Sequence, residues 1–290
     1  MREHALTVVV ATRNRCERLD AALAALTALP ERPPVVVVDD GSTDGTAAMV
    51  RERWPAVQLV ALPANRGAAA RNAGVRAART RYVAFCDDDC WWEAGALGRA
   101  VALLDAHPSV ALLNARVVVA EEERTDAACA LMAVSPLRKR SACPGAAIGA
   151  FMAGASVVRR DAFLSAGGYH ERYHIGAEES LLALDFLARG WEMIYVDDLV
   201  VHHDPYAIGR APALRRRAVM RNRLWTAWLR RSLRGAWRAT FALAWDARCD
   251  AVARAALADA LRGLPWVLRE RRPVGPQVER MLDALTELPA

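Results

Sequence analysis

Apolar, strand-like runs alternate with helix-like segments through the first 120 residues, and this alternation limits the chain to a small set of folds. The runs rich in β-branched residues are Leu6–Ala11, Val35–Val38, Val57–Leu62, Tyr82–Cys86 and Val110–Val119. The segments with helical periodicity between them are Glu17–Leu29, Gly45–Arg53, Ala68–Ala78 and Ala94–Ala106. A strand recurs about every 20 to 25 residues, a spacing typical of βαβ units. The pattern predicts an α/β fold with a mostly parallel, doubly wound sheet flanked by helices.

Polar side chains follow three of these strands at the point where each strand ends. They are Thr12-Arg13-Asn14, Asp39-Asp40-Gly41-Ser42 and Asp87-Asp88-Asp89. The carboxyl ends of parallel strands meet at one edge of the sheet, where open α/β sheets bind ligands. Three adjacent carboxylates repel one another unless a cation lies between them, and Mg²⁺ or Mn²⁺ shared with phosphates suits such oxygens. The sequence therefore indicates a metal-assisted enzyme that acts on a phosphate-bearing substrate.

Composition excludes several other classes of protein. The chain has 290 residues, of which 54% are apolar, enough for one large domain or one domain with an appendage. It has no amino-terminal signal pattern and no apolar run of the roughly 18 to 20 residues that a membrane span requires. Six cysteines without a Cys-x-x-Cys pair indicate reduced thiols. We therefore expect a cytoplasmic protein, either free or peripheral at the inner face of the cell membrane.

The alternating pattern fails over residues 121–149 and resumes over Phe151–His203. Long connections in compact domains often serve as lids, so a mobile loop is expected at about 121–149. We accordingly predict a catalytic domain over residues 1–205, in which residues 1–120 form a nucleotide-binding half and residues 121–205 an acceptor-side half. A basic, tryptophan-rich helical region over residues 206–290 follows.

Several blocks together resemble the family 2 glycosyltransferases, which have the GT-A fold. They are Val8–Arg15, Val37–Thr46, Asn65–Gly67 with Ala70–Gly74, Phe85–Asp89, Gly167–Tyr169, Glu178-Glu179 and His202-His203, in the order of that family. The resemblance covers residues 5 to 205. It implies a Rossmann-like, mixed and mostly parallel sheet, and an inverting transfer of a sugar from a UDP- or dTDP-linked donor to a hydroxyl-bearing acceptor.

The resemblance also implies a divalent cation, Mn²⁺ or Mg²⁺, near the acidic triplet. Asp89 matches the direct metal ligand, while Asp87 and Asp88 share the contacts to the ribose or to the metal and its water. A histidine often completes the metal site near the end of the Leu199–Val201 run. We prefer His202 for this role over His203.

A second set of residues matches the nucleotide-binding side of the family. Asp40 corresponds to the carboxylate that accepts from the imide N–H of uracil or thymine. Thr12, Asn14 and Arg71 correspond to residues around the nucleotide. Asp39 either shares the work of Asp40 or is a strand-end carboxylate satisfied by backbone N–H groups.

The chain departs from the family at the expected catalytic base. Inversion in one displacement requires a base that takes the proton of the acceptor hydroxyl. The family supplies it from a Glu-Asp pair at the start of a helix, whereas this chain has Glu178-Glu179. Glu179 aligns with the usual base but is one methylene longer, so either Glu179 or Glu178 fills this role.

The carboxyl-terminal region combines arginine with tryptophan. Ten arginines and no acidic residue lie between Pro205 and Trp245. Trp225, Trp228, Trp237, Phe241 and Trp245 fall at spacings that predict one apolar helical face. This face either packs on the catalytic domain or lies on an anionic membrane surface, which would suit a lipid-linked acceptor. No recognition motif indicates a nucleic-acid partner.

Two other functions compete with the glycosyltransferase. A sugar-nucleotide pyrophosphorylase requires a glycine-rich basic loop after the first strand, which Thr12–Arg15 does not supply. A membrane-surface adaptor with a degenerate site is supported only by the departure at Glu178-Glu179.

Overall fold

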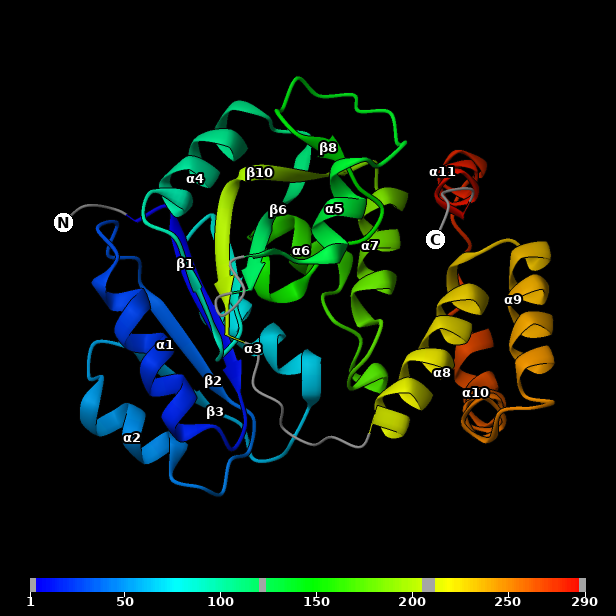
Figure 1. The fold of residues 1–290 in the computed structure, drawn as a ribbon, viewed down its shortest axis with the longest axis horizontal. Coiled ribbons are helices and arrows are strands. Elements are labelled where there is room, and N and C mark those ends of the chain that lie inside the picture. The colour runs from blue at the N-terminus through cyan, green and yellow to red at the C-terminus, as the bar shows by residue number, and fades with distance from the viewer. Residues whose placement is uncertain (1–3, 120–123, 205–211, 287–290) are drawn as a thin grey trace.

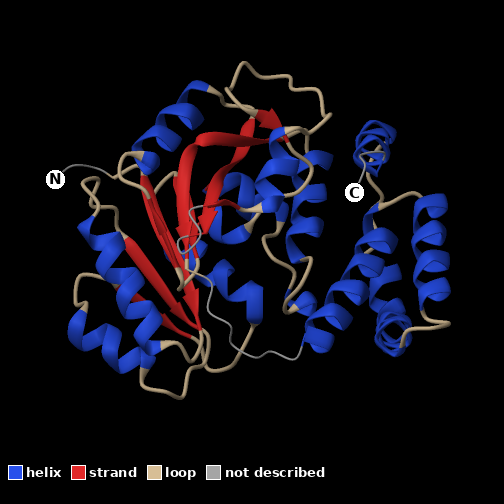
Figure 2. Ribbon diagram, viewed as in Figure 1, coloured by secondary structure: helices blue, strands red, loops and turns tan. Residues whose placement is uncertain are grey.

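A ten-stranded mixed sheet forms the centre of the amino-terminal part of this computed structural model, which describes residues 4–119, 124–204 and 212–286 (Figure 2). The strand order is β3-β2-β1-β4-β9-β6-β10-β5, with β7 beside β6 and β8 beside β10. The strands are β1 (Leu6–Thr12), β2 (Val35–Asp39), β3 (Gln58–Ala61), β4 (Tyr82–Cys86), β5 (Cys90–Trp92), β6 (Val110–Val119), β7 (Arg124–Thr125), β8 (Ala146–Ala147), β9 (Ser156–Arg159) and β10 (Glu192–His203). The predicted α/β class is confirmed.

The four strands from β3 to β4 are parallel, and their alignment brings three loops to one sheet edge. Thr12 at the end of β1 pairs with Asp39 at the end of β2, and Val10 of β1 pairs with Cys86 at the end of β4. Strands β1, β2 and β4 are almost entirely buried, as parallel strands covered on both faces are, whereas β3 at the edge of the sheet is partly exposed. The polar residues that follow them therefore emerge together at the carboxyl edge.

Helices and short 3₁₀ segments connect the strands of the amino-terminal part. The helices are α1 (Cys16–Ala28), α2 (Thr46–Arg53), α3 (Ala70–Ala77), α4 (Ala96–Ala106), α5 (Ala127–Ala133), α6 (Arg160–Ala166) and α7 (Glu178–Ala188). The 3₁₀ segments are η1 (Gly67–Ala69), η2 (Ala153–Ala155) and η3 (Glu171–Tyr173). Helix α3 packs against β1 and β2, with Gly74 lying directly against Val9 and Val38.

The second half of the sheet contains a strand that the sequence pattern did not predict. Strand β5 follows the acidic triplet and pairs antiparallel with the end of β10, so that Cys90 lies opposite His203. It has three residues, too few for an alternation of apolar and polar side chains to be recognised. The pairing carries the end of β10 to the carboxylates that follow β4.

The segment expected as a long mobile loop contains regular structure where it is described. Residues 124–149 include β7, α5 and β8, and Cys129 and Cys143 from this segment are buried in the core. The side chain of Asp126 caps α5 by accepting from the backbone N–H of Ala128 at 2.8 Å. This cap residue is a local signal for the helix. Residues 120–123 of the expected loop lie outside the described residues.

The carboxyl-terminal region is helical, as predicted, and lies at the opposite end of the molecule from α1 and α2 (Figure 1). Its helices are α8 (Pro212–Arg230), α9 (Leu233–Asp246), α10 (Ala251–Arg269) and α11 (Pro276–Thr286). Among the described residues, no helix is both long enough and apolar enough to cross a bilayer.

The expected single apolar face from Trp225 to Trp245 is divided between two helices. Helix α8 ends at Arg230, and Ser232 caps α9 by accepting from the N–H of Gly235 at 3.1 Å. Trp225 is buried in a small core shared with Tyr173 of the amino-terminal part. Trp245 is 69% exposed. The region therefore packs on the amino-terminal part through α8, while the large rings that follow the break, Trp237, Phe241 and Trp245, are at least half exposed.

Two helical glycines give a matched test of how closely α3 packs on the sheet. A Cβ at Gly74 would collide with Val9 and come within 3.0 Å of Val38, whereas a Cβ at Gly98 of α4 meets no atom within 4 Å. We expect Gly74→Ala to lower the free energy of unfolding by about 1 to 3 kcal/mol. Gly98→Ala should raise it by up to about 1 kcal/mol, because alanine favours the helix. Chemical denaturation measures both, and equal stability of the two variants would contradict the close approach of α3 to the sheet.

Candidate active site

The three carboxylates after β4 turn toward different partners. Asp87 forms an ion pair with Arg71 of α3. Asp88 accepts from the Thr12 hydroxyl at 2.6 Å and from Arg15 Nη1 at 2.7 Å. Asp89 accepts from the same Arg15 nitrogen at 2.8 Å. The mutual repulsion of the triplet is thus offset by two guanidinium groups, one on each side.

Arg15 is a site residue that the sequence reasoning missed. It bridges Asp88 and Asp89 with a side chain that is 26% exposed. Burial alone would lower the pKa of Arg15, but the adjacent Asp88 and Asp89 raise it above its ordinary value. Burial raises the pKa of Asp88, against the opposing effects of Thr12 and Arg15. The position of Arg15 in the polar segment after the first strand was the available signal.

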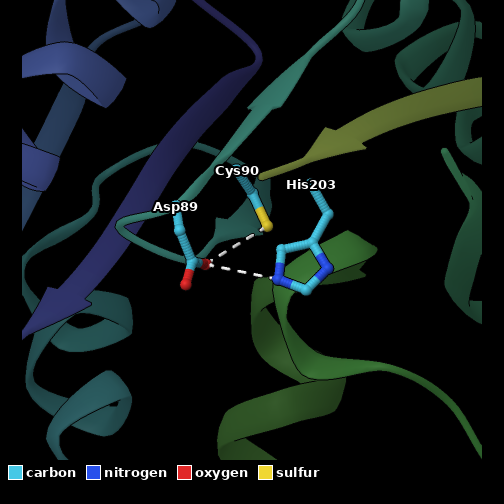
Figure 3. A group of neighbouring side chains, drawn as sticks. All are labelled: Asp89, Cys90 and His203. Atoms are coloured by element: carbon cyan, nitrogen blue, oxygen red, sulfur yellow. Dashed lines mark hydrogen bonds and ion pairs between the residues drawn. The ribbon is translucent and has the colours of Figure 1, made fainter. Parts of the chain in front are cut away.

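Asp89, Cys90 and His203 form a group that can hold a metal ion (Figure 3). Their potential ligand atoms all lie within 4.8 Å of one another. His203 Nε2 and Cys90 Sγ are each 3.7 Å from Asp89 Oδ1. Carboxylate and imidazole are donors that Mn²⁺ accepts, so these residues fit the expected cation. Burial, followed by the charge of Asp87, raises the pKa of the Cys90 thiol well above its ordinary value.

The structure places His203, and not the preferred His202, beside the acidic triplet. Successive side chains of a strand point to opposite faces, so the two histidines of β10 diverge. His202 stacks on Trp91, with ring centroids 5.4 Å apart, and its Nε2 lies 3.7 Å from Glu93. The pairing of β10 with β5 decides which histidine faces the triplet, and the sequence motif alone does not contain this information.

The predicted nucleotide-side residues hold the loops of the carboxyl edge together. Asp40 accepts from the backbone N–H groups of Arg66 at 2.6 Å and Gly67 at 2.9 Å. Asp39 accepts from the N–H of Ser42 at 3.0 Å, which matches the strand-end alternative considered for it.

Asn14 joins the loops after β1 and β2. Its side chain accepts from the Thr43 N–H at 2.8 Å, and its backbone N–H donates to the Ser42 hydroxyl at 2.9 Å. Its φ of 54° lies in the left-handed region, which asparagine tolerates better than most residues. Thr12, Asn14, Asp39 and Asp40 are therefore gathered at one edge, as the strand pattern predicts.

Arg71 connects this edge to the start of α7. Its guanidinium lies 5.9 Å from the ring centroid of Tyr169. Burial lowers the pKa of Arg71, but the charge of Asp87 raises it above its ordinary value. Arg71 Nε, the Tyr169 hydroxyl and Glu178 Oε2 are buried and have no hydrogen-bond partner among the described residues. Buried polar atoms are normally paired, so these three atoms mark a place that is completed by a ligand or by water.

Glu178 and Glu179 occupy the first turn of α7, where the helix dipole favours negative charge. Glu178 is 7% exposed, and burial raises its pKa. Glu179 is partly exposed, and burial followed by the charge of Glu178 raises its pKa to about 7. A carboxyl group with a pKa near neutrality is suited to accept a proton in a reaction.

The loop that leads into this turn is held by the carboxyl-terminal helices. The buried amide of Asn222 in α8 donates to the backbone carbonyls of Tyr173 at 3.0 Å, Ile175 at 3.1 Å and Gly176 at 2.6 Å. Ala177, the residue before Glu178, has a φ of 59°, a conformation unfavourable for alanine. The contacts of Asn222 compensate for this backbone strain and fix where α7 begins.

A pocket of about 200 Å³ adjoins the metal-ligating group. Its walls are Arg18, Ala21, Ala22 and Ala25 of α1, together with Asp88, Asp89, Trp91 and Asp204. The lining combines apolar side chains, the three alanines and Trp91, with the charged groups of Arg18 and three aspartates, so the pocket accommodates a ligand with both kinds of surface.

Comparison with known proteins places this site in a family. The family model described as "Glycosyl transferase family 2" matches residues 7–165. Succinoglycan biosynthesis protein ExoO of Rhizobium meliloti (strain 1021) is 45% identical over 87 residues, which are 29% of this chain and 25% of that protein. The N-acetylglucosaminyl-diphospho-decaprenol L-rhamnosyltransferase of Mycobacterium tuberculosis (strain CDC 1551 / Oshkosh) is 27% identical over 250 residues, 72% of this chain and 79% of that protein.

A solved structure supports the fold over nearly the whole chain. The mannosyltransferase PcManGT from Pyrobaculum calidifontis, in complex with GDP-Man and Mn²⁺, matches with a TM-score of 0.57 and 22% identity. The match covers 98% of this chain and 87% of that one. At this identity the likeness concerns the fold, which is that of GT-A enzymes.

The metal-ligating group gives a direct prediction about cation binding. We expect Asp89→Asn and His203→Ala each to weaken Mn²⁺ binding by about tenfold or more, because each removes a donor. His202→Ala serves as the matched control and should bind Mn²⁺ as the unaltered protein does. Titration followed by electron paramagnetic resonance of free Mn²⁺ measures the affinities. A loss with His202→Ala and none with His203→Ala would reverse the assignment.

Proposed function

The chain belongs to glycosyl transferase family 2, and from this membership we propose that it transfers a sugar from a UDP- or dTDP-linked donor to a hydroxyl group with inversion. The observation that carries the proposal is the convergence of carboxylates, guanidinium groups and a glutamate pair at one carboxyl edge of the sheet. Asp89 and His203 would hold a divalent cation, Mn²⁺ or Mg²⁺, with Asp87 or Asp88 close by. When bound, such a cation would supply positive charge that neutralises the leaving diphosphate.

We assign the nucleotide to the edge formed by the loops after β1, β2 and β4. Both oxygens of Asp40 already accept a backbone N–H, but a carboxylate oxygen has a second lone pair that remains for the imide N–H of the base. Thr12, Asn14 and Arg71 border the same edge, and Asp88 lies between Thr12 and Arg15. The paired guanidinium groups lower the cost of bringing a diphosphate to these carboxylates.

Glu179 is proposed as the general base. In a single displacement the acceptor oxygen bonds to the anomeric carbon, the bond from that carbon to the diphosphate oxygen breaks, and the hydroxyl proton passes to the Glu179 carboxylate. Glu179 is partly exposed, whereas Glu178 is 7% exposed, so Glu179 is the better placed of the two to reach an acceptor. The additional methylene of glutamate extends that reach.

A glycan attached to a lipid carrier is the proposed acceptor class. The mycobacterial relative is named for transfer to N-acetylglucosaminyl-diphospho-decaprenol. A role in bacterial polysaccharide or glycolipid synthesis at the inner face of the cell membrane would follow from such an acceptor. Synthesis of a small-molecule glycoside is the alternative that a water-soluble acceptor would indicate.

A panel of nucleotide sugars, scored by released nucleoside diphosphate, tests the proposed activity. We expect one UDP- or dTDP-sugar to be turned over with Mn²⁺. Glu179→Gln should reduce turnover by about 100-fold or more, because it removes the base, while calorimetric donor binding stays within about threefold.

The isosteric change Glu178→Gln is the matched control and should retain turnover. Loss of turnover with Glu178→Gln alone would identify Glu178 as the base. Absence of any nucleotide binding, with or without metal, would instead support the non-catalytic adaptor.

The raised pKa of Glu179 predicts the pH dependence of the reaction. A base acts when deprotonated, so the active fraction falls as the pH drops below about 7. We expect kcat/KM to fall about tenfold per pH unit below that pKa and to level off above it. Removing the neighbouring charge with Glu178→Gln should shift the inflection to lower pH, because Glu178 contributes to the raised pKa. An unshifted profile in that variant would contradict the proposed coupling, and Glu171→Gln at an exposed position serves as the control.

A further inference from the structure

Helix α9 carries a row of large apolar side chains that are each at least half exposed among the described residues. Leu233, Trp237, Phe241 and Trp245 are 60%, 50%, 68% and 69% exposed, respectively. Their spacing of four residues places them along one face, which we call the α9 stripe. Figure 1 shows α9 at the end of the molecule, on the side of the carboxyl-terminal helices away from the sheet. Contiguous exposed apolar surface of this kind marks an interaction site.

The carboxyl-terminal helices that include the α9 stripe carry a strongly positive net charge. Residues 212–286 contain sixteen arginines and six acidic residues, a net formal charge of +10 within a chain whose total is +6. The rest of the chain therefore has a net charge of −4. Arg248 lies over the ring of Trp245, 4.0 Å from its centroid, and Arg234 of α9 is exposed and has no ion pair with a described residue. Positive charge is thus concentrated on the helices that bear the exposed rings.

We propose that the α9 stripe docks on the surface of an anionic lipid bilayer. Aromatic rings enter the boundary between headgroups and acyl chains, while arginines remain at the level of the phosphates. Helix α9 then lies in the membrane plane with Ala236 and Leu243, which are buried, facing the protein. The proposal concerns a binding surface and does not require the reaction proposed above.

Other occupants fit the α9 stripe less well. A symmetric contact between two copies would bring the arginine-rich surfaces against each other and would be opposed by their repulsion. Single-stranded nucleic acid stacks on open rings within a groove. Here Trp237 stacks on Phe241 with centroids 5.8 Å apart, and Trp228 meets the edge of Trp237 at 5.3 Å. The rings therefore form one apolar ridge, a shape suited to a bilayer surface.

The docked helices also contact the loop before the glutamate pair. Trp266 of α10 stacks on His170, with centroids 5.0 Å apart, and Glu270 pairs with the same histidine at 3.0 Å. Asn222 of α8 holds the carbonyls of Ile175 and Gly176. A bilayer in contact with α9 would therefore be connected to the start of α7 through the packed helices α8 and α10. This arrangement would place the glutamate pair in a fixed position relative to an acceptor at the lipid surface.

Vesicle co-sedimentation of the full chain tests the proposal. The vesicles contain phosphatidylcholine alone or phosphatidylcholine with phosphatidylglycerol. We expect binding to the anionic vesicles to be at least roughly tenfold tighter and to weaken with salt. The triple variant Trp237→Ser, Phe241→Ser, Trp245→Ser should lose about tenfold or more of this affinity.

The matched control changes exposed apolar residues at a distance from the stripe. Leu131→Ser with Val134→Ser alters side chains of α5 and its end that are 58% and 66% exposed and should leave vesicle binding unchanged. Thermal unfolding midpoints and calorimetric donor binding establish that each variant is folded.

Three outcomes would overturn the proposal. The first is equal vesicle binding by the triple variant and the unaltered chain, or no binding by either. The second is a dimeric mass in light scattering that the triple variant reduces to that of a monomer, which would assign the stripe to a second copy. The third is displacement of the vesicles by single-stranded RNA together with loss of RNA binding in the triple variant. Loss of sugar transfer with intact vesicle binding would count only against the proposed reaction.

Discussion

The repulsion among Asp87, Asp88 and Asp89 is the constraint around which the site is built. Parallel strands bring these carboxylates to an edge where burial removes much of the screening by water. Arg15 and Arg71 offset the repulsion from opposite sides, and each is fixed by a different segment, the loop after β1 and helix α3. The two guanidinium groups therefore hold each of the three carboxylates in place before any ligand binds. They also keep the edge from becoming so negative that a diphosphate is repelled.

The mixed half of the sheet, in which β5 and β9 are antiparallel to their neighbours, adds groups that the parallel half lacks. Pairing of β5 with β10 brings His203 to Asp89, and the start of α7 places the glutamate pair near Arg71. Helix α3 is joined to the same region because the Asn72 side chain exchanges two hydrogen bonds with the backbone of Tyr169, at 2.7 and 2.9 Å. The carboxyl edge of the parallel strands and the separately positioned glutamate pair thus lie around the same charged groups, Arg71 and the acidic triplet.

Sequence reasoning predicted the strand ends and the acidic triplet because these depend on local pattern and on the rule that parallel strands end together. The glutamate pair was predicted from the resemblance to the family. Sequence reasoning did not distinguish His202 from His203, because the pairing of β10 with β5 decides which of two successive side chains points toward the triplet. Arg15 was missed because its role depends on contacts more than 70 positions along the chain. Sequence reasoning also did not predict that the carboxyl-terminal apolar face is divided at Ser232. The apolar spacing continues through this position, but the Ser232 side chain caps a new helix there.

The buried amide of Asn222 has a consequence for how the molecule can be divided. The boundary near residue 205 separates two regions by composition, yet three main-chain oxygens of the first region find their donor in the second. The amino-terminal part therefore depends on the carboxyl-terminal helices to satisfy these backbone carbonyls. A chimaera that exchanges the carboxyl-terminal helices between relatives must carry a matching donor at this position, or the turn before Glu178 will relax toward a less strained backbone.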